Sequence, residues 1–319
     1  MDWFGAGGNG PLIVARAIHF AATAITAGSL VFGAVVAGPA LRSEEAEARL
    51  LQRQAVVVAW VGLAIAAASG VTWFLLQAAA MTGLAPGEVL ESGELSTVLH
   101  QTQFGQVSEV RIALAVMLAA CLAGDRFPMA KWLALAAASG LTAAIAWTGH
   151  AGSTLGEMGD LHLIADGLHL LAAAAWIGGL ASLVLLLVAA QRNRLVARAP
   201  LVQAAAARFS TLGIISVATL LVTGLVNTWI LVGSFHALAV TEYGRLLMLK
   251  IVAFAVMLAF AAFNRLYLTP RLTLSGTEPR RLHALRQLSR NSTIEIAMGL
   301  TIFAIVGMLG TLHPAIHPL

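Results

Sequence analysis

Eight long apolar runs, separated by short polar segments, restrict what this chain can fold into more than any other feature. The runs cover residues 12–40, 54–80, 104–124, 130–149, 161–190, 204–232, 243–266 and 291–312. A helix needs about 20 mainly apolar residues to cross the hydrocarbon core of a bilayer, and each run reaches that length. The first run is too long for the core of a signal peptide. The sequence therefore predicts an all-α integral membrane protein with eight transmembrane helices.

The composition excludes a soluble protein and several kinds of site. The chain is 59% hydrophobic and 11% charged, whereas soluble domains carry about 25% charged residues. Cys121 is the only cysteine, which rules out an internal disulfide and a CxxC metal or redox site. The sequence has no P-loop, GxSxG, HExxH or Rossmann motif, so it supports neither ATP-driven transport nor soluble-type hydrolysis. The pI of about 10.0 reflects arginines between the spans rather than nucleic-acid binding.

The connecting segments alternate in charge and so predict the orientation of the spans. Lys and Arg collect in segments 41–53, 124–131, 191–208 and 265–290, whereas segments 81–103, 150–160 and 233–242 contain neither. Positively charged loops stay on the cytoplasmic side of a membrane. We therefore expect both termini outside, in the periplasm, and the protein in the bacterial inner membrane.

Eight of the nine histidines then fall in the outer half or the outer loops. They are His19, His100, His150, His162, His169, His236, His313 and His317; only His283 falls inside. Either histidine is simply well tolerated at the membrane interface, or these side chains form an outward-facing site for a metal or another imidazole-binding ligand.

The two halves of the chain resemble each other. AIHFAATAITAGSL (17–30) resembles GLHLLAAAAWIGGL (167–180), SGVTW (69–73) resembles TGLVNTW (223–229) with two extra residues, TQFG (102–105) resembles TEYG (241–244), and WTGH (147–150) resembles GTLH (310–313). Four pairs in the same order predict two parallel four-helix repeats, residues 1–150 and 151–319, related by a pseudo-two-fold axis along the membrane normal. The alignment pairs His19 with His169, His150 with His313 and Arg111 with Lys250.

The fifth span carries the most polar stripe. Helical spacing puts His162, Asp166, His169, Ala173, Trp176 and Leu180 within an arc of roughly 80°. Asp166 either orients His169 as a hydrogen-bond acceptor or is a direct ligand beside His162. The alternative is a structural Asp–His pair that closes the helix bundle.

These observations give two groups of candidate residues. The predicted metal ligands are His19, His150, His162, Asp166, His169 and His313. The predicted pathway or supporting residues are Met158, Trp176, Arg111, Lys250 and Glu295. In the second group, Met158 offers a thioether, and Glu295 is a candidate proton relay near the inner end of the last span. Arg111 and Lys250 either snorkel outward, pair with Glu109 or Glu242, or bind an anionic group such as a propionate.

The stretches YGRLLMLK (243–250) and FNRLYLTP (263–270) resemble the core of the copper-resistance membrane protein D (CopD) family. DGLHLLAAAAWIGGL (166–180) and IEIAMGLTIFAIVGMLGTLHP (294–314) resemble its flanking helices, and TQFGQVSEVR (102–111) its first half. The resemblance implies an eight-helix inner-membrane protein that imports copper from periplasm to cytoplasm. It points chiefly to His169 and Trp176, and to a periplasmic copper-binding protein as a possible donor.

Two other functions stay open at this point. Paired histidines in a four-helix unit also hold b-type haem, here as His19 with His150 and His169 with His313. The protein would then be an electron-transfer or oxidoreductase module, with Arg111 or Lys250 near the propionates. The third hypothesis is an assembly partner for a copper enzyme, without transport of its own. The copper-transport hypothesis, which we favour, requires no enzymatic activity.

Overall fold

The computed structural model describes residues 10–40, 45–124, 129–192, 199–274 and 278–316, and all regular structure within them is helical. Eight helices in these ranges are long and apolar enough to cross a membrane, which confirms the predicted number of spans. They are Gly10–Ala37, Gln52–Thr82, Gln103–Ala123, Ala130–Thr148, Glu157–Gln191, Val202–Val232, Glu242–Leu272 and Pro279–Leu309.

Several spans consist of more than one helical element. In chain order the elements are α1 (Gly10–Val31), η1 (Phe32–Ala37), α2 (Gly38–Ala40), α3 (Glu45–Thr82), α4 (Pro86–Glu91), α5 (Glu94–Gln101), α6 (Gln103–Ala123), α7 (Ala130–Ala143), η2 (Ala144–Thr148), α8 (His150–Ser153), α9 (Glu157–Ala173), η3 (Ala174–Gly178), α10 (Gly179–Arg192), α11 (Ala199–Val232), α12 (Phe235–Val240), α13 (Glu242–Phe263), η5 (Asn264–Leu268), α14 (Thr269–Leu274) and α15 (Glu278–Leu309). The segment between the second and third spans holds two short helices, α4 and α5.

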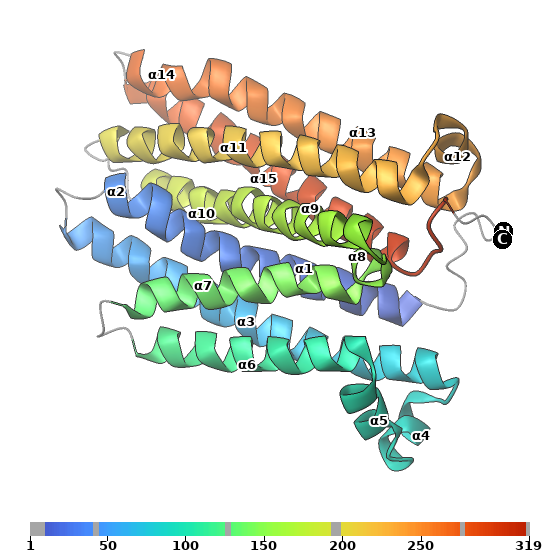
Figure 1. Ribbon diagram of the computed structural model, residues 1–319. Helices are drawn as coiled ribbons and strands as arrows, with labels where there is room; N and C mark the ends of the chain where they lie inside the picture. Colours follow the sequence, from blue (N-terminus) through green and yellow to red (C-terminus); the bar gives the residue numbers. More distant parts are fainter. Residues whose placement is uncertain (1–9, 41–44, 125–128, 193–198, 275–277, 317–319) are drawn as a thin grey trace.

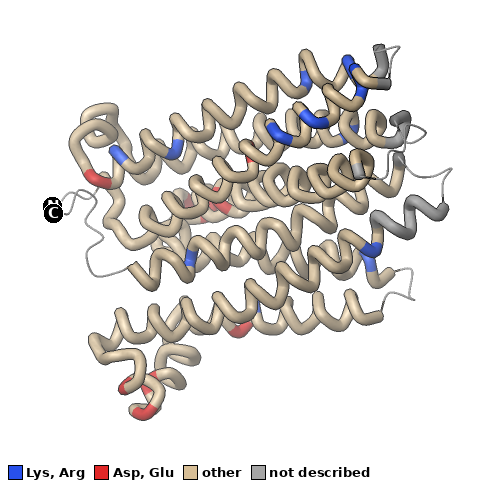
Figure 2. Tube along the Cα trace, turned by 180° about the vertical axis from the view of Figure 1, so that it is seen from behind, with Lys and Arg blue, Asp and Glu red and all other residues tan. Residues whose placement is uncertain are grey.

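The helices form one elongated bundle with different chemistry at its two ends (Figure 1). The short helices α4, α5, α8 and α12 lie at one end, where α1 begins and α15 finishes; we call this the short-helix end. Lys and Arg gather towards the opposite end, which we call the basic end (Figure 2). The first and fifth spans are the most buried: in the most apolar 18-residue stretch of each, 61% of the residues are buried within the protein. The centre of the bundle is therefore built from these two helices.

The two central helices cross at a pair of glycines. A Cβ atom added at Gly28 would collide with the carbonyl oxygen of Ala174, and one added at Gly178 would collide with that of Ala24. Small residues let membrane helices approach closely enough for extensive van der Waals contact. Each helix contributes an alanine and the glycine four residues after it. The two alanine–glycine pairs pack against each other, so the contact is reciprocal.

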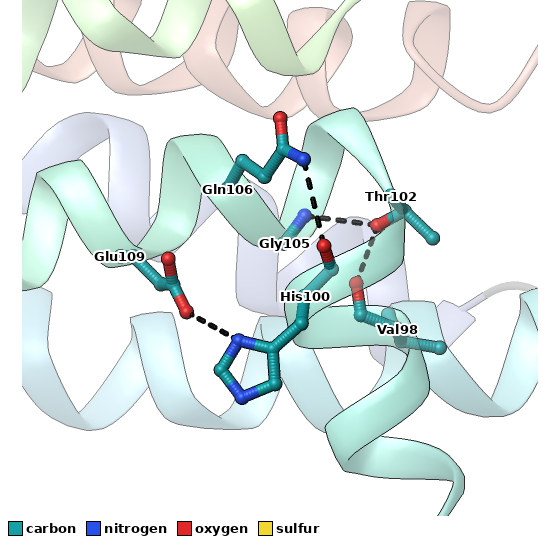
Figure 3. A network of polar contacts seen from close by, with 6 residues as sticks. All are labelled: Val98, His100, Thr102, Gly105, Gln106 and Glu109. Carbon is teal, nitrogen blue, oxygen red and sulfur yellow. Dashed lines mark hydrogen bonds and ion pairs between the residues drawn. The ribbon is translucent and has the colours of Figure 1, made fainter.

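The third and seventh spans begin with the same local structure. Thr102 Oγ1 accepts a hydrogen bond from the backbone N–H of Gly105 at 3.0 Å, and Thr241 Oγ1 accepts one from Gly244 at the same distance. Threonine in this position satisfies one of the N–H groups that a helix leaves free at its start. Figure 3 shows the first of these caps together with the neighbouring turn.

Three spans contain a wider π-helical turn: η1, η3 and η5. Such turns insert one extra residue into an α-helix and often occur at functional sites. The turn η3 follows Ala173 and contains Trp176, so the regular helical spacing that predicts one continuous polar stripe on the fifth span applies only as far as Ala173.

Candidate functional site

Five side chains from α1, α3 and α6 are joined by polar and ring contacts, and we call this group the first pocket: Arg16, His19, Ser69, Trp73 and Arg111. The Nδ1 atom of His19 lies 2.9 Å from the carbonyl oxygen of Ala66, which can only accept, so Nδ1 carries the proton. The Nε2 atom of His19 then has the lone pair, and Arg111 donates a hydrogen bond to it. Both ring nitrogens are thus occupied, which leaves no lone pair for a metal ion.

Two guanidinium groups stack against one indole ring in the first pocket. The guanidinium carbons of Arg16 and Arg111 each lie 5.3 Å from the ring centroid of Trp73. Arg16 Nη1 also donates to the carbonyl oxygen of Gly310 at 3.2 Å. The sequence predicts Arg111 as a site residue but does not single out Arg16 or Trp73.

Five side chains from α9, α11 and α13 interact with one another, and we call this group the second pocket: Asp166, His169, Thr223, Asn227 and Lys250. The hydroxyl of Thr223 donates to the carbonyl oxygen of Thr219 at 2.6 Å. At 2.9 Å from His169 Nδ1 it therefore accepts, and Nδ1 carries the proton. The Nε2 atom of His169 keeps its lone pair, and no hydrogen bond to it is found among the described residues.

Opposite charges meet beside His169. Asn227 Nδ2 donates to Asp166 Oδ1 at 3.2 Å. Lys250 lies close enough to interact electrostatically with both Asp166 and His169. Asp166 and His169 are only half-buried within the protein. This pocket therefore offers an open imidazole nitrogen beside a carboxylate, which is a donor set suited to a cation.

A group of three histidines, which we call the end group, lies at the short-helix end: His150, His162 and His313. His150 Nε2 donates to the carbonyl oxygen of Leu309 at 3.3 Å, which leaves Nδ1 unprotonated. The hydroxyl of Thr154 donates to the carbonyl oxygen of His150 at 3.0 Å, so it accepts from His162 Nδ1 at 2.9 Å. His150 interacts electrostatically with the other two histidines. His150 and His162 each keep one nitrogen lone pair.

Burial lowers the pKa of His150 below its ordinary value of 6.5. The positive charge of Arg16 and the neighbouring His313 lower the pKa further, whereas the hydrogen bond to Leu309 opposes the shift. His150 is therefore a neutral imidazole at pH 7, which is the form that binds metal ions.

Tyr243 connects the end group to the second pocket. Its ring packs edge-on against His150, with the centroids 5.9 Å apart, and it interacts electrostatically with Asp166. We call the series His150, Tyr243, Asp166 and His169 the polar line. His169 follows the first residue of α9 by twelve positions, or about 18 Å along the helix axis. The polar line thus runs from the short-helix end deep into the bundle.

A cavity of about 330 Å³ lies beyond His169, between α11, α13 and α15. Leu221, which lines it, is two residues from Thr223, and Ala206 lines it nearer the basic end. Its lining is mainly apolar but includes Trp176 and the buried Glu295. Asn264 Nδ2 donates to Glu295 Oε1 at 2.6 Å, and Asn291 Nδ2 donates to Asn264 Oδ1 at 2.9 Å. Two predicted pathway residues therefore share one cavity.

The predicted metal ligands do not form one cluster. Within the part of the chain that the structure describes, no group of three or more His, Cys, Asp or Glu side chains is arranged to hold a metal ion. The six residues are divided between the first pocket (His19), the second pocket (Asp166 and His169) and the end group. Met158 is 43% exposed in the first turn of α9.

Three of the four histidines of the haem alternative have hydrogen-bond partners within the protein. His19 bonds to Ala66 and Arg111, and His150 bonds to Leu309. His169 bonds to Thr223 on α11. Because both ring nitrogens of His19 have hydrogen-bond partners, this ring offers no free lone pair to a haem iron.

Two family models match the chain. The model described as "Copper resistance protein D-like, N-terminal domain" matches residues 8–160, and the one described as "Copper resistance protein D" matches residues 203–309. Together they cover most of the chain. This chain belongs to the copper resistance protein D family.

Relatives of this family member include proteins named for copper. Copper resistance protein D of Pseudomonas syringae pv. tomato is 28% identical over 260 residues, which are 80% of this chain and 82% of that protein. Inner membrane protein YebZ of Escherichia coli (strain K12) is 29% identical over 312 residues, 95% and 98% of the two chains. Copper transport protein CutJ of Bacillus subtilis (strain 168) is 30% identical over 249 residues, 76% of this chain but 44% of that protein. No solved structure matches.

Proposed function

We propose that this CopD-family protein is a bacterial inner-membrane protein that binds copper at its periplasmic side and passes it through its second half to the cytoplasm. The observation that carries the proposal is the open Nε2 of His169 beside Asp166, at the inner end of the polar line. The copper-related names of two relatives support the choice of metal. The reaction is binding and transfer, without enzymatic chemistry.

The donor chemistry agrees with copper as the cargo. Imidazole nitrogen suits copper, whereas Ca²⁺ and Mg²⁺ require cages of oxygen ligands. The unprotonated nitrogens of His150 and His162 would collect the ion at the short-helix end. His169 and Asp166 would take it next, and the cavity with Trp176 and Glu295 continues towards the basic end.

The distribution of charge supports the orientation in the membrane that this proposal requires. Lys and Arg gather at the basic end (Figure 2), and positively charged loops face the cytoplasm. In this orientation both termini and the end group face the periplasm, where a periplasmic copper-binding protein would deliver the ion. The cavity then lies on the cytoplasmic side of His169.

We also propose that residues 1–150 and 151–319 are two copies of one four-helix unit, related by a pseudo-two-fold axis between the central helices. The reciprocal contact of Gly28 with Gly178 supports this arrangement, as do the matching threonine caps of α6 and α13. The copper route uses one copy only, because Arg111 already occupies Nε2 of His19.

The test is copper binding and copper uptake by the purified protein in liposomes that contain a copper-sensitive dye. We expect His169→Ala to lower bound copper and uptake at least about tenfold, the loss typical when a metal-binding interaction is removed. His236→Ala is the matched control, because His236 is exposed in α12, away from the polar line. Wild-type uptake by a folded His169→Ala protein would contradict the assignment.

Two further measurements separate the alternatives. Asp166→Asn should weaken copper binding in the same direction, whereas Asp160→Asn, exposed on the same helix, should not. A visible absorption spectrum of the same samples tests the haem alternative. A Soret band that disappears in His169→Ala would replace the copper proposal with a haem protein.

A further inference from the structure

The first pocket contains two buried positive charges without a counter-ion. Arg16 is 6% exposed and Arg111 is 7% exposed. No ion pair of either side chain is found in the described ranges, and Glu109, the nearest carboxylate along α6, pairs instead with His100 at 2.8 Å (Figure 3). Arginine stays protonated in proteins. The pocket therefore holds a double positive charge inside a membrane span, an arrangement that normally requires a partner.

Three hydrogen-bond donors in this pocket also lack acceptors. Among the described residues, Nε of Arg16, Nε of Arg111 and Nε1 of Trp73 have no hydrogen-bond partner, although all three are buried. Buried polar groups in native proteins are nearly always hydrogen-bonded. The three unsatisfied atoms are all N–H groups, so the missing partner must accept hydrogen bonds.

We propose that the first pocket is a binding site for a small anion, either a halide or a carboxylate group. Both guanidinium carbons lie 5.3 Å from the centroid of one ring, so both charges and the unsatisfied Nε1–H of Trp73 surround a single side chain. A monovalent anion would offset one of the two positive charges and accept hydrogen bonds from the unsatisfied N–H groups, whereas a neutral acceptor would offset no charge. His19 contributes no competing charge, because its neutral ring accepts from Arg111.

The second pocket provides an internal contrast that supports this proposal. There, Asp166 supplies the negative charge beside Lys250, and Asn227 donates to that carboxylate. Asp166 follows Arg16 by the same 150 positions by which His169 follows His19. The first pocket thus has an arginine where the second has its own acid, and it must obtain negative charge from outside the chain.

The test is the thermal stability of the full-length protein in detergent as chloride replaces gluconate at constant ionic strength. Gluconate is the bulky reference anion, and because the ionic strength is constant, screening by salt is the same throughout while the specific anion changes. We expect a saturable rise in Tm with chloride that is lost in Arg16→Gln and Arg111→Gln and kept in Lys250→Gln. A parallel series with formate identifies the source: a rise with formate alone assigns the site to a carboxylate.

A milder variant keeps the proposal testable if the arginine variants do not fold. Trp73→Phe preserves the ring beneath both guanidinium groups but removes the Nε1 donor, so the chloride or formate concentration at half effect should rise several-fold. Equal Tm values in chloride, formate and gluconate would overturn the proposal. So would an anion response that is unchanged in Trp73→Phe and in the folded arginine variants.

Discussion

The first and second pockets hold their histidines in similar ways but surround them with different charges. Ser69 Oγ lies 3.3 Å from Nδ1 of His19, and Thr223 Oγ1 lies 2.9 Å from Nδ1 of His169. The next residue in each helix is a glycine: a Cβ atom there would lie 3.1 Å from Cε1 of His19 or 3.5 Å from Cε1 of His169. In both pockets the second helix of the half therefore supports the ring from the same side.

The difference arises one helical turn before each histidine. Arg16 stacks on Trp73 in the first pocket, whereas Asp166 accepts from Asn227 in the second. When this position holds an arginine, Arg111 has no acidic partner from it and donates a hydrogen bond to the Nε2 lone pair of His19 instead. With aspartate there, Lys250 has an opposite charge nearby, and His169 keeps its lone pair free. One residue type at one position thus decides whether the pocket favours an anion or a cation.

The largest expected effect concerns the crossing that joins the two halves. We expect Gly28→Ala and Gly178→Ala each to destabilise the protein by about 3 kcal/mol or more, because the added methyl group meets backbone that cannot move aside. If the crossing is symmetric, the two losses are similar. Gly167→Ala, which meets nothing within 4 Å, is the control. The measurement is thermal unfolding in detergent, and a clear inequality between the two variants would argue against equivalent halves.

The next prediction compares the hydroxyl groups that support the two rings. Thr223→Val removes the only hydrogen bond found for His169 in the described structure, which should cost about 0.5–1.5 kcal/mol and weaken copper binding several-fold. Ser69→Ala should cost less, because Nδ1 of His19 keeps the carbonyl oxygen of Ala66 at 2.9 Å. Copper titration and thermal unfolding of both variants check this. Equal losses would mean that the two rings depend on their hydroxyl groups to the same degree.

The sequence predicts the membrane architecture well because the physical requirement is simple. Each span needs enough apolar residues to cross the bilayer, and eight such runs can be counted directly; the resemblance to the CopD family is likewise confirmed by the family models. Asp166, His169 and Lys250 are also predicted, since polar residues within apolar spans are rare and conspicuous. Their meeting in space follows from the order of the helices in the bundle.

Other features of the site could not be predicted from the spacing of residues along the chain. The π-helical turn η3 changes which face of the helix the side chains after Ala173 occupy, and no residue type in that stretch predicts such a turn. Aligning SGVTW with TGLVNTW through a gap pairs Trp73 with Trp229, whereas the contacts make Trp73 the counterpart of Asn227. The predicted ligand His19 has no free lone pair because Arg111 donates a hydrogen bond to its Nε2 atom. Side-chain direction, not position along the helix, decides that contact.

The smallest expected effect separates the end group from the first pocket by their response to pH. Burial, Arg16 and His313 lower the pKa of His150, whereas Leu309 opposes the shift; His162 and Tyr243 also face its ring. A histidine of pKa 6.5 loses half of its neutral form at pH 6.5, so copper capture that relies on His150 should fall less than about twofold between pH 7.5 and pH 6.5. The fall becomes steep only at lower pH, as His150 takes up its proton.

The anion response of the first pocket should be flat over the same range, because Arg16 and Arg111 stay charged. Copper titrations and chloride-dependent Tm values at each pH measure the two responses. A steep loss of copper binding with its midpoint above pH 6.5 in the wild type, absent in His150→Gln, would contradict the lowered pKa and with it the role of His150 as a neutral ligand at the entrance.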